Sequence, residues 1–360
     1  MIRKVFLSDI CYYVSSKIPV GQVQLSNYVS TENLLQNKGG LSVANKLPSG
    51  KVTAFQAGDV LVSNIRPYFK KIWLADRSGG ASNDVLVFRK LNDEIYEKYL
   101  YYILADDRFF AFSTASASGS KMPRGDKTQI MNYPVNLPPL DQQKKIADIL
   151  SSLDEKIELN RRMNETLEQL GQTLFRHYFV DKTKRGNNIQ TLPLGERIRP
   201  KRGKSLQSKN MIHGNIPVIS GGLKPAGFHN KANTVAPVIT ISASGANAGF
   251  VSVWGEPVWS ADSSYIDSTI TKYVYTYYLF LKNKQKEIYD MQTGSGQPHI
   301  YPKHIELLEV ANLPDCDFNA FEQRVRPLFD MIHKNKKQID YLSNIRDLLL
   351  PKLISGEIEV

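Results

Sequence analysis

Two long amphipathic segments dominate this sequence, and each follows a basic stretch. They run roughly from Asp141 to Phe179 and from Phe318 to Ile354. Aligned without gaps, their centres match position by position, so the chain repeats one unit made of a globular stretch and a helix. The apolar residues recur in steps of mostly three and four, which is typical of a coiled coil. This duplication predicts two copies of one task held at a fixed separation, more readily than a single-pocket enzyme.

Both segments carry an asparagine at equivalent positions of the apolar seam, Asn160 and Asn335. A buried seam Asn lowers stability but selects register and orientation. Short joins between each globular stretch and its helix predict an up-and-down path, with an antiparallel helix pair and one globular stretch at each end. The alternative is two unrelated core helices. The predicted seam consists of Leu153, Ile157, Asn160, Leu167, Leu174, Leu328, Ile332, Asn335, Leu342 and Leu349.

The net charge of +11 is confined to the globular stretches. Residues 1–140 hold 17 Lys/Arg against 11 Asp/Glu, and residues 181–315 hold 16 against 10. Residues 141–180 hold 6 against 7, and residues 316–360 hold 7 of each sign. Two basic stretches on near-neutral helices favour a polyanion with two contact sites, and duplex DNA or RNA is the first candidate. The alternative is solubility charge without a target.

The composition is that of an ordinary globular protein, with 42% hydrophobic and 22% charged residues. No apolar run approaches the ~20 residues that span a bilayer. The first residues hold no apolar core of a signal peptide. Cys11 and Cys316 lie at opposite ends of the chain, so a disulfide framework is not expected. We therefore expect a cytoplasmic protein without membrane contact.

The two globular stretches share an order of strands, helix and loop. Short β-branched runs at 59–63, 84–89 and 237–242 predict strands, and 93–112 and 272–290 predict helices. A loop of small and polar residues then follows in each stretch, with Gly119-Ser120 matched by Gly294-Ser295. The polar run 182–188 predicts a linker.

Four fragments resemble the specificity subunits of type I restriction-modification systems. The run 137–157, Leu-Pro-Pro-Leu-Asp-Gln-Gln-Lys-Lys-Ile onward, looks like their central conserved region, and 348–358 resembles their distal conserved region. Gly58-Asp-Val-Leu-Val-Ser-Asn-Ile-Arg-Pro67 and Ile241-Ser-Ala-Ser-Gly-Ala-Asn-Ala-Gly249 are similar to parts of their target-recognition domains. The resemblance covers essentially the whole chain and recurs in both halves.

This resemblance implies an α+β fold with two α/β target-recognition domains, separated by two long antiparallel coiled-coil helices in a pseudo-two-fold internal repeat. The domains would be 1–138 and 181–314, and the spacer helices 139–180 and 315–360. Each domain would read one half of a bipartite site in double-stranded DNA. The helices would space the domains and dock two methyltransferase subunits, which restriction subunits join in a nuclease complex. S-adenosylmethionine would bind the methyltransferase, and no cofactor this chain.

Catalytic motifs are weak in this chain. Asn136-Leu-Pro-Pro-Leu140 lacks the aromatic residue of a methyltransferase loop that holds a flipped base. Gly203-Lys204-Ser205 lacks the earlier glycine of a phosphate-binding loop, because Ile198 stands there. The six histidines show no zinc-ligand spacing. We therefore expect no catalytic and no metal site, and a chain that is not an enzyme by itself.

Basic, amide and aromatic side chains near the strand ends and in the small-residue loops are the candidates for DNA contact. Arg can hold guanine bidentately, Lys binds phosphate as a point charge, and Gln suits adenine. For each of them the alternative is a solvated surface position. The candidates are Asn64, Arg66, Tyr68, Lys70, Lys71, Ser120, Lys121, Arg124, Lys201, Arg202, Lys204, Ser295, Gln297 and His299.

Two other readings stay open beside the specificity subunit. One is a coiled-coil scaffold that recruits partners without sequence-specific DNA reading. The other is an unrecognised nuclease or methyltransferase.

The second long helix is entered through Leu313-Pro-Asp-Cys-Asp-Phe318 and lacks the Gln142-Gln143 pair of the first. We therefore expect two docking surfaces that are not equivalent.

Overall fold

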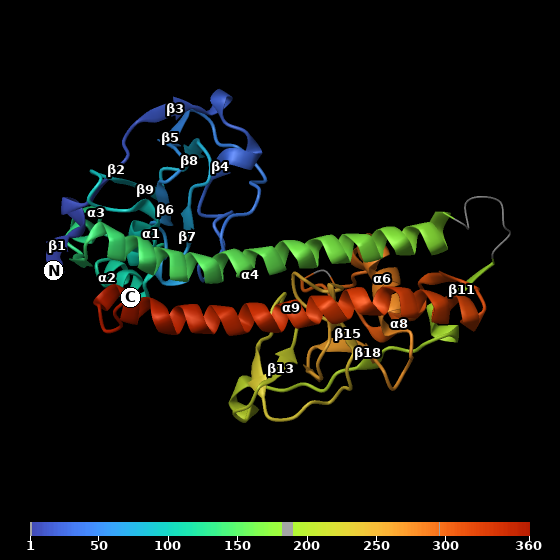
Figure 1. Cartoon of the computed structure of the whole chain (residues 1–360). Helices are drawn as coiled ribbons and strands as arrows, with labels where there is room; N and C mark the ends of the chain where they lie inside the picture. The colour runs from blue at the N-terminus through green and yellow to red at the C-terminus, as the bar shows by residue number, and fades with distance from the viewer. Residues whose placement is uncertain (1, 182–189, 295) are drawn as a thin grey trace. The chain divides into compact units, whose positions relative to one another are not determined.

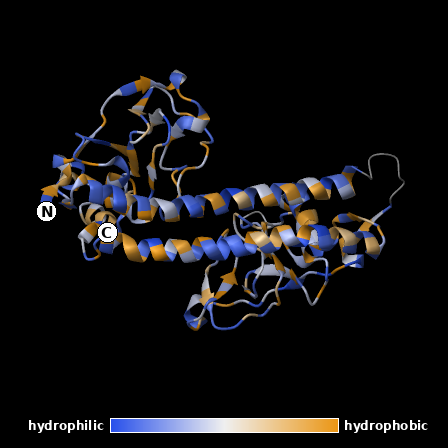
Figure 2. Ribbon diagram, in the orientation of Figure 1, coloured by the Kyte–Doolittle hydropathy of each residue, from blue (hydrophilic) through white to orange (hydrophobic). Residues whose placement is uncertain are grey.

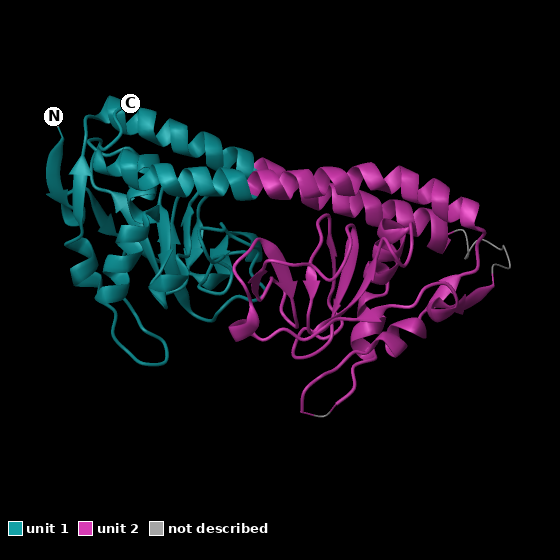
Figure 3. Ribbon diagram, turned by 90° about the horizontal axis from the view of Figure 1, so that it is seen from below, with its two compact units in different colours: residues 1–158, 340–360 teal, residues 159–339 magenta. Residues whose placement is uncertain are grey.

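A computed structural model describes residues 2–181, 190–294 and 296–360. It divides into two compact units, and Figure 3 shows them in different colours. Unit 1 comprises Met1–Glu158 with Asp340–Val360, and unit 2 comprises Leu159–Ile339. The division falls within both long helices, α4 (Leu140–Phe175) and α9 (Asp315–Ser355), so each unit contains a part of each.

Unit 1 contains two four-stranded sheets and a short strand pair. The first sheet is antiparallel in the order β2-β9-β6-β7, the second has the order β3-β5-β8-β4, and β1 pairs with β10. Every residue of the central strand β6 is buried, because the strand is covered on both faces. The bounds are β1 Arg3–Phe6, β2 Cys11–Tyr13, β3 Lys17–Pro19, β4 Tyr28–Val29, β5 Lys51–Phe55, β6 Val60–Ser63, β7 Ile72–Leu74, β8 Gly79–Ala81, β9 Val85–Lys90 and β10 Pro134–Leu137.

Unit 2 repeats the first sheet and the strand pair of unit 1. Its antiparallel sheet has the order β12-β18-β15-β16, and β11 pairs with β19. The second sheet differs, because it has three strands in the order β14-β13-β17. The bounds are β11 Thr191–Pro193, β12 Lys201–Arg202, β13 Ile216–Ile219, β14 Gly227–His229, β15 Val238–Ser242, β16 Val251–Trp254, β17 Trp259–Ser260, β18 Ser263–Asp267 and β19 Glu309–Ala311.

Each unit also has a pair of helices and a short third helix. The helices predicted over 93–112 and 272–290 are each divided into two. The pairs are α1 Glu97–Ala105 with α2 Asp107–Ala115, and α6 Val274–Asn283 with α7 Gln285–Asp290; the short helices are α3 Lys127–Met131 and α8 Pro302–Glu306. In unit 1 the break lies at Asp106, whose backbone is extended and whose carboxylate accepts from the Arg108 amide. An Asp prefers this N-cap position to a helix interior, and apolar periodicity alone does not reveal the break.

The long helices lie side by side with opposite directions within each unit (Figure 1). In unit 1 the early part of α4 and the late part of α9 belong to one core cluster, with Ile146 and Leu150 beside Leu350 and Leu353. In unit 2 the late part of α4 packs on the early part of α9, where the Phe175 ring lies 6.0 Å from that of Phe321. Both helices alternate hydrophobic and hydrophilic residues, as Figure 2 shows. The predicted α+β fold with an internal repeat is confirmed.

All ten predicted seam residues are buried or half-buried. Ile157, Asn160, Ile332 and Asn335 are buried, and the six leucines at 153, 167, 174, 328, 342 and 349 are half-buried. The two asparagines bond to different partners and not to each other among the described residues. Asn160 donates to Gln338 at 2.9 Å, and Asn335 donates to Asn164 at 2.9 Å.

Candidate nucleic-acid interface

In unit 1 the structure joins two segments that the sequence offered separately. The chain leaves β6 through Asn64 and Arg66 and meets the loop 118–124. The Arg66 amide donates to the Pro123 carbonyl at 2.8 Å, and Ile65 forms an isolated bridge with Arg124. The loop is closed by two backbone hydrogen bonds between Ser118 and Arg124, of 3.0 and 2.9 Å. The strand end and the loop therefore make one surface, which we call the unit 1 loop surface (residues 64–71 and 118–124).

Unit 2 builds the same surface from equivalent positions. The Gly245 amide donates to the Pro298 carbonyl at 3.1 Å, and Ser244 bridges His299. Two backbone hydrogen bonds between Thr293 and His299 close the loop. We call residues 243–245 and 293–299 the unit 2 loop surface; the predicted contact Ser295 lies outside the described residues. In Figure 3 this loop extends away from the paired helices.

Glycines at equivalent places turn both loops. Gly119 has φ +101° and Gly294 has φ +103°, in the region that L side chains rarely adopt. The same backbone path therefore presents different side chains, Lys121 and Arg124 in unit 1, and Gln297 and His299 in unit 2. This arrangement suits a common scaffold that reads two different ligand surfaces.

Arg66 is the most constrained of the predicted contacts in unit 1. Its backbone is left-handed, with φ 51°, and its Nη2 donates to the Lys121 carbonyl at 3.2 Å. Its Nε is buried and has no hydrogen-bond acceptor among the described residues. Tyr68, Ser120, Lys121 and Arg124 are exposed beside it.

Three other predicted contacts of unit 1 are held by the protein itself. Asn64 is 6% exposed, so its side chain is not part of the surface. Lys71 is half-buried and donates to the Thr31 carbonyl, and desolvation lowers its pKa. Lys70 pairs with Asp107 at 2.7 Å. These three residues lie under the surface or are paired within the protein. Their residue types alone did not reveal that they are buried or paired.

In unit 2 the strand β12 brings the basic run 201–204 to the same sheet as the loop surface. Lys201, Arg202, Lys204 and Gln297 are exposed, and His299 is half-buried. The Arg202 guanidinium lies 6.0 Å from the Tyr301 ring, which stacks on His299 at an interplanar angle of 15°. Sequence reasoning missed Tyr301, an exposed aromatic residue two positions after His299.

A carboxylate stands beside the loop surface of each unit, and the sequence analysis missed both. Asp84 pairs with Arg124 at 3.2 Å, and Asp262 pairs with Arg202 at 2.8 Å. Their carbonyls accept equivalent backbone bonds, from Asn64 in unit 1 and from Ala243 in unit 2. Exposed ion pairs add little stability, so their main effect is to orient the guanidinium groups. Each of these aspartates directly precedes the strand β9 or β18, and this shared position in the sequence could have revealed them.

The join between domain and long helix differs in the two units, as the missing Gln pair suggested. Gln143 is buried and links α4 to the domain by accepting from the Tyr96 amide at 2.9 Å. In unit 2, Glu322 accepts from the Thr276 amide at 2.8 Å. Burial raises the pKa of Glu322, against the lowering effect of the Thr276 bonds. Gln143 and Glu322 are both buried and join the long helix to the domain of their own unit, and the non-equivalence of the two docking surfaces stays a prediction.

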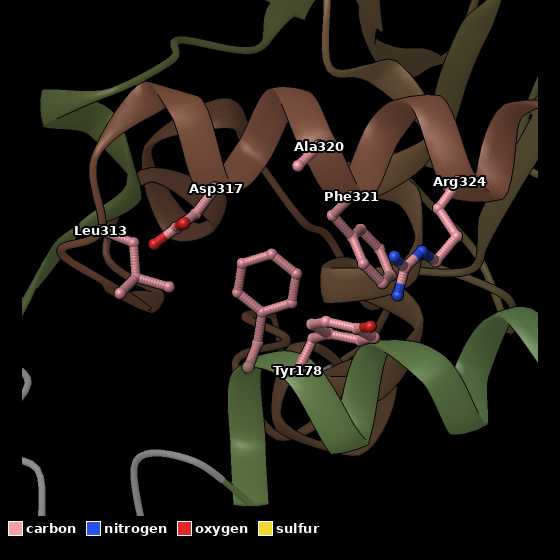
Figure 4. Close-up of a pocket in the computed structure, with 7 residues that line it drawn as sticks. Tyr178, Leu313, Asp317, Ala320, Phe321 and Arg324 are labelled. Atoms are coloured by element: carbon pink, nitrogen blue, oxygen red, sulfur yellow. The ribbon is translucent and has the colours of Figure 1, made fainter.

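Figure 4 shows a cavity of about 120 Å³ in unit 2 that is lined by no residue of either loop surface. Its lining residues are Tyr178, Phe179, Leu313, Asp317, Ala320, Phe321 and Arg324. Within residues 2–181, 190–294 and 296–360, no group of three His, Cys, Asp or Glu side chains is placed to hold a metal ion. In the same ranges, no helix has the length and apolarity to cross a membrane.

The structure thus repeats an α+β unit with a polar loop surface, and basic residues lie on this surface in unit 1 and beside it, at 201–204, in unit 2. Residues 3–169 match the family model of the type I restriction modification DNA specificity domain. The chain is 29% identical over 184 residues to the type I restriction enzyme HindI specificity subunit of Haemophilus influenzae, covering 49% of this chain and 40% of the relative. It is 24% identical to the MjaIX specificity subunit of Methanocaldococcus jannaschii, covering 74% and 70%.

A solved structure has the same fold. The S subunit of a type I restriction-modification system from M. genitalium aligns with a TM-score of 0.61 at 20% identity, covering 98% of this chain and 96% of that one. The chain is therefore similar to specificity subunits of type I restriction enzymes, and its residues 3–169 match a type I restriction modification DNA specificity domain. It spans less than half the length of the Haemophilus influenzae relative.

Proposed function

We propose that this chain is the DNA specificity subunit of a type I restriction-modification complex and has no chemistry of its own. The observation that carries the proposal is the repeated loop surface, with one backbone frame and different side chains in the two units. The excess of basic residues in both globular stretches supports DNA as the ligand. Each unit would read one half of a bipartite site.

The finer assignments of the proposal concern the partners. The two long helices would space the recognition units and dock two methyltransferase subunits, with restriction subunits added in a nuclease complex. S-adenosylmethionine would be held by the methyltransferase and not by this chain. The relatives are named as specificity subunits of type I restriction enzymes, and this supports the division of labour. The cytoplasm, where the chromosome lies in a bacterial or archaeal cell, is the compartment that fits this function.

Mapping of methylated adenines with and without this gene tests the function directly. The expected result is a split motif whose methylation disappears with the gene. A map that does not change would refute the proposal. Purified complex should also bind duplex DNA selectively, with salt-sensitive affinity and two footprints about one helical turn (~34 Å) apart.

Charge reversal separates this function from a scaffold without DNA reading. Glu at Arg66, Lys121 and Lys201 should reduce DNA affinity, because each of these side chains lies on or beside a loop surface. Lys144→Glu is the matched control, since Lys144 is exposed on α4. Equal affinity of the triple variant and the control would favour the scaffold.

A further inference from the structure

The unit 1 loop surface rests on a strained pair of loops. The non-glycine residues with positive φ among the described residues are Asn37 (55°), Lys38 (58°), Arg66 (51°) and Lys70 (50°). All of them belong to two adjoining loops of unit 1. Such conformations persist only where the surrounding structure enforces them, and they gather at ligand clamps. In unit 2 the position of Arg66 is taken by Gly245, which adopts φ 79° without a side chain to strain it.

Backbone hydrogen bonds hold the two loops against each other. The Asn37 amide donates to the Phe69 carbonyl and the Lys38 amide to the Lys70 carbonyl, each at 2.9 Å. The loop 66–70 is also closed on itself, since the Lys70 amide donates to the Pro67 carbonyl at 2.8 Å. The backbone that carries Arg66 and Tyr68 is therefore seated on residues 37–38.

The Lys38 side chain enters the protein beneath this seat. Only 6% of it is exposed, and its Nζ lies 3.0 Å from Asp107 of α2 and 3.3 Å from Asp347 of α9. Lys70 shares the Asp107 carboxylate at 2.7 Å. Partial burial alone would raise the pKa of Asp107, but the bonds from Lys70 and Lys38 lower it. A buried ammonium is stable only while such partners remain.

The network continues into the helix pair of unit 1. Arg346, beside Asp347 on α9, pairs with Asp154 of α4 at 2.7 Å. Asp154 also accepts from the Tyr102 hydroxyl at 2.9 Å, which reaches α1. A chain of charged groups thus runs from the loop 66–70 through Lys38 to both long helices.

We propose that Lys38 is a positioning residue for DNA reading by unit 1. Through its ion pairs with Asp107 of α2 and Asp347 of α9, Lys38 anchors the loop 66–70, which carries Arg66 and Tyr68. The inference rests on the proposed function. The two half-sites would then be read in different ways. Unit 1 presents Arg66 on a loop that is held in place by Lys38, whereas unit 2 has Gly245 at the equivalent position. Lys38 itself, being buried, touches no DNA.

The test uses Lys38→Met in the assembled complex, measured by methylation mapping and by competition between cognate and one-half-mutated duplexes. We expect a roughly tenfold or greater loss of discrimination in the half-site that Arg66→Ala also relaxes. Discrimination in the other half should stay intact. The slope of log affinity against log salt should not change, because a buried lysine releases no counterions from phosphate.

Three variants complete the design. Lys98→Met is the matched control, since Lys98 pairs with Glu155 elsewhere in unit 1, and it should leave both half-sites unchanged. Lys38→Arg keeps the charge and should restore most of the discrimination. If Lys38→Met does not fold, Asp347→Asn decides, because Lys38 then keeps Asp107 and Arg346 keeps Asp154, while the loop loses its charged link to α9.

The outcomes separate the inference from the proposed function. Wild-type complex without bipartite selectivity would overturn the function itself. Selective wild type with full discrimination in Lys38→Met, or equal loss in both half-sites, would overturn the role of Lys38. For Asp347→Asn, undiminished discrimination would do the same.

Discussion

Acidification should destabilise unit 2 through one half-buried imidazole, that of His333 on α9. Its Nε2 is buried without a hydrogen-bond partner among the described residues, and Gly255 lies directly against the ring. The Tyr275 ring of α6 lies 6.0 Å away. Burial, together with Lys336 and Lys337 on the same helix, lowers the pKa of His333 from 6.5 to about 4. Glu256, which lies 3.9 Å from Lys337, is the acidic group on the facing turn.

The sign and size of the effect follow from proton linkage. The unfolded chain binds the proton near pH 6.5 and the folded chain only near pH 4, so the stabilising effect is complete above pH 6.5 and is lost as the pH falls towards 4. At pH 5 these two values give a loss of about 2 kcal/mol. Because the imidazole keeps some contact with solvent, screening reduces this to about 1–2 kcal/mol.

Urea unfolding of wild type and His333→Gln at about pH 7 and about pH 5 measures this difference. The wild type should lose about 1–2 kcal/mol more than the variant on acidification, since glutamine does not titrate. His213→Gln, at an exposed position of unit 2, is the matched control and should behave as wild type. An equal loss in wild type and His333→Gln would refute the reasoning.

Three further predictions concern packing and DNA contact. Phe329→Ala should destabilise unit 2 by about 3–5 kcal/mol, because the buried ring stacks on Tyr275 at 4.7 Å; a change below about 1 kcal/mol in urea unfolding would contradict this. Gly255→Ala should cost about 1–3 kcal/mol, because its Cβ would lie 2.2 Å from His333 Cγ, and a double-mutant cycle with His333→Ala should show relief of the clash and not additivity. Lys121→Ala should lower the salt slope of DNA binding by about 1 with little change in sequence preference, whereas an unchanged slope would remove Lys121 from the phosphate contacts.

The strongly periodic parts of the chain were predictable because their signal is local. The long helices were expected over 141–179 and 318–354, and they occupy Leu140–Phe175 and Asp315–Ser355. The strand expected at 237–242 is β15, Val238–Ser242. The helix expected over 93–112 is divided, because Asp106 is buried and caps α2. Its capping bond depends on local geometry that apolar spacing does not encode.

The candidate site was predictable by residue type more than by position. Basic and amide residues near the strand ends and in the loops were chosen by type, and their contact with DNA stays a prediction; Asn64 is buried and Lys70 is paired with Asp107. Asp84, Asp262 and Tyr301 were missed. Burial and pairing depend on neighbours far along the chain, so charge alone could not separate contact residues from supporting ones.

The sequence by itself determined the duplication, the periodicity of the helices and the confinement of positive charge to the globular stretches, because each is a property of residues near one another in the chain. Only the tertiary structure decided which segments meet. It joins Arg66 to the loop 118–124, and it pairs Asn160 with Gln338 and Asn335 with Asn164, where the repeat had suggested that the two asparagines match. It also gives Lys38 its partners Asp107 and Asp347. Contacts between residues so far apart are fixed by backbone pairing and by the burial of charge, which spacing along the sequence does not contain.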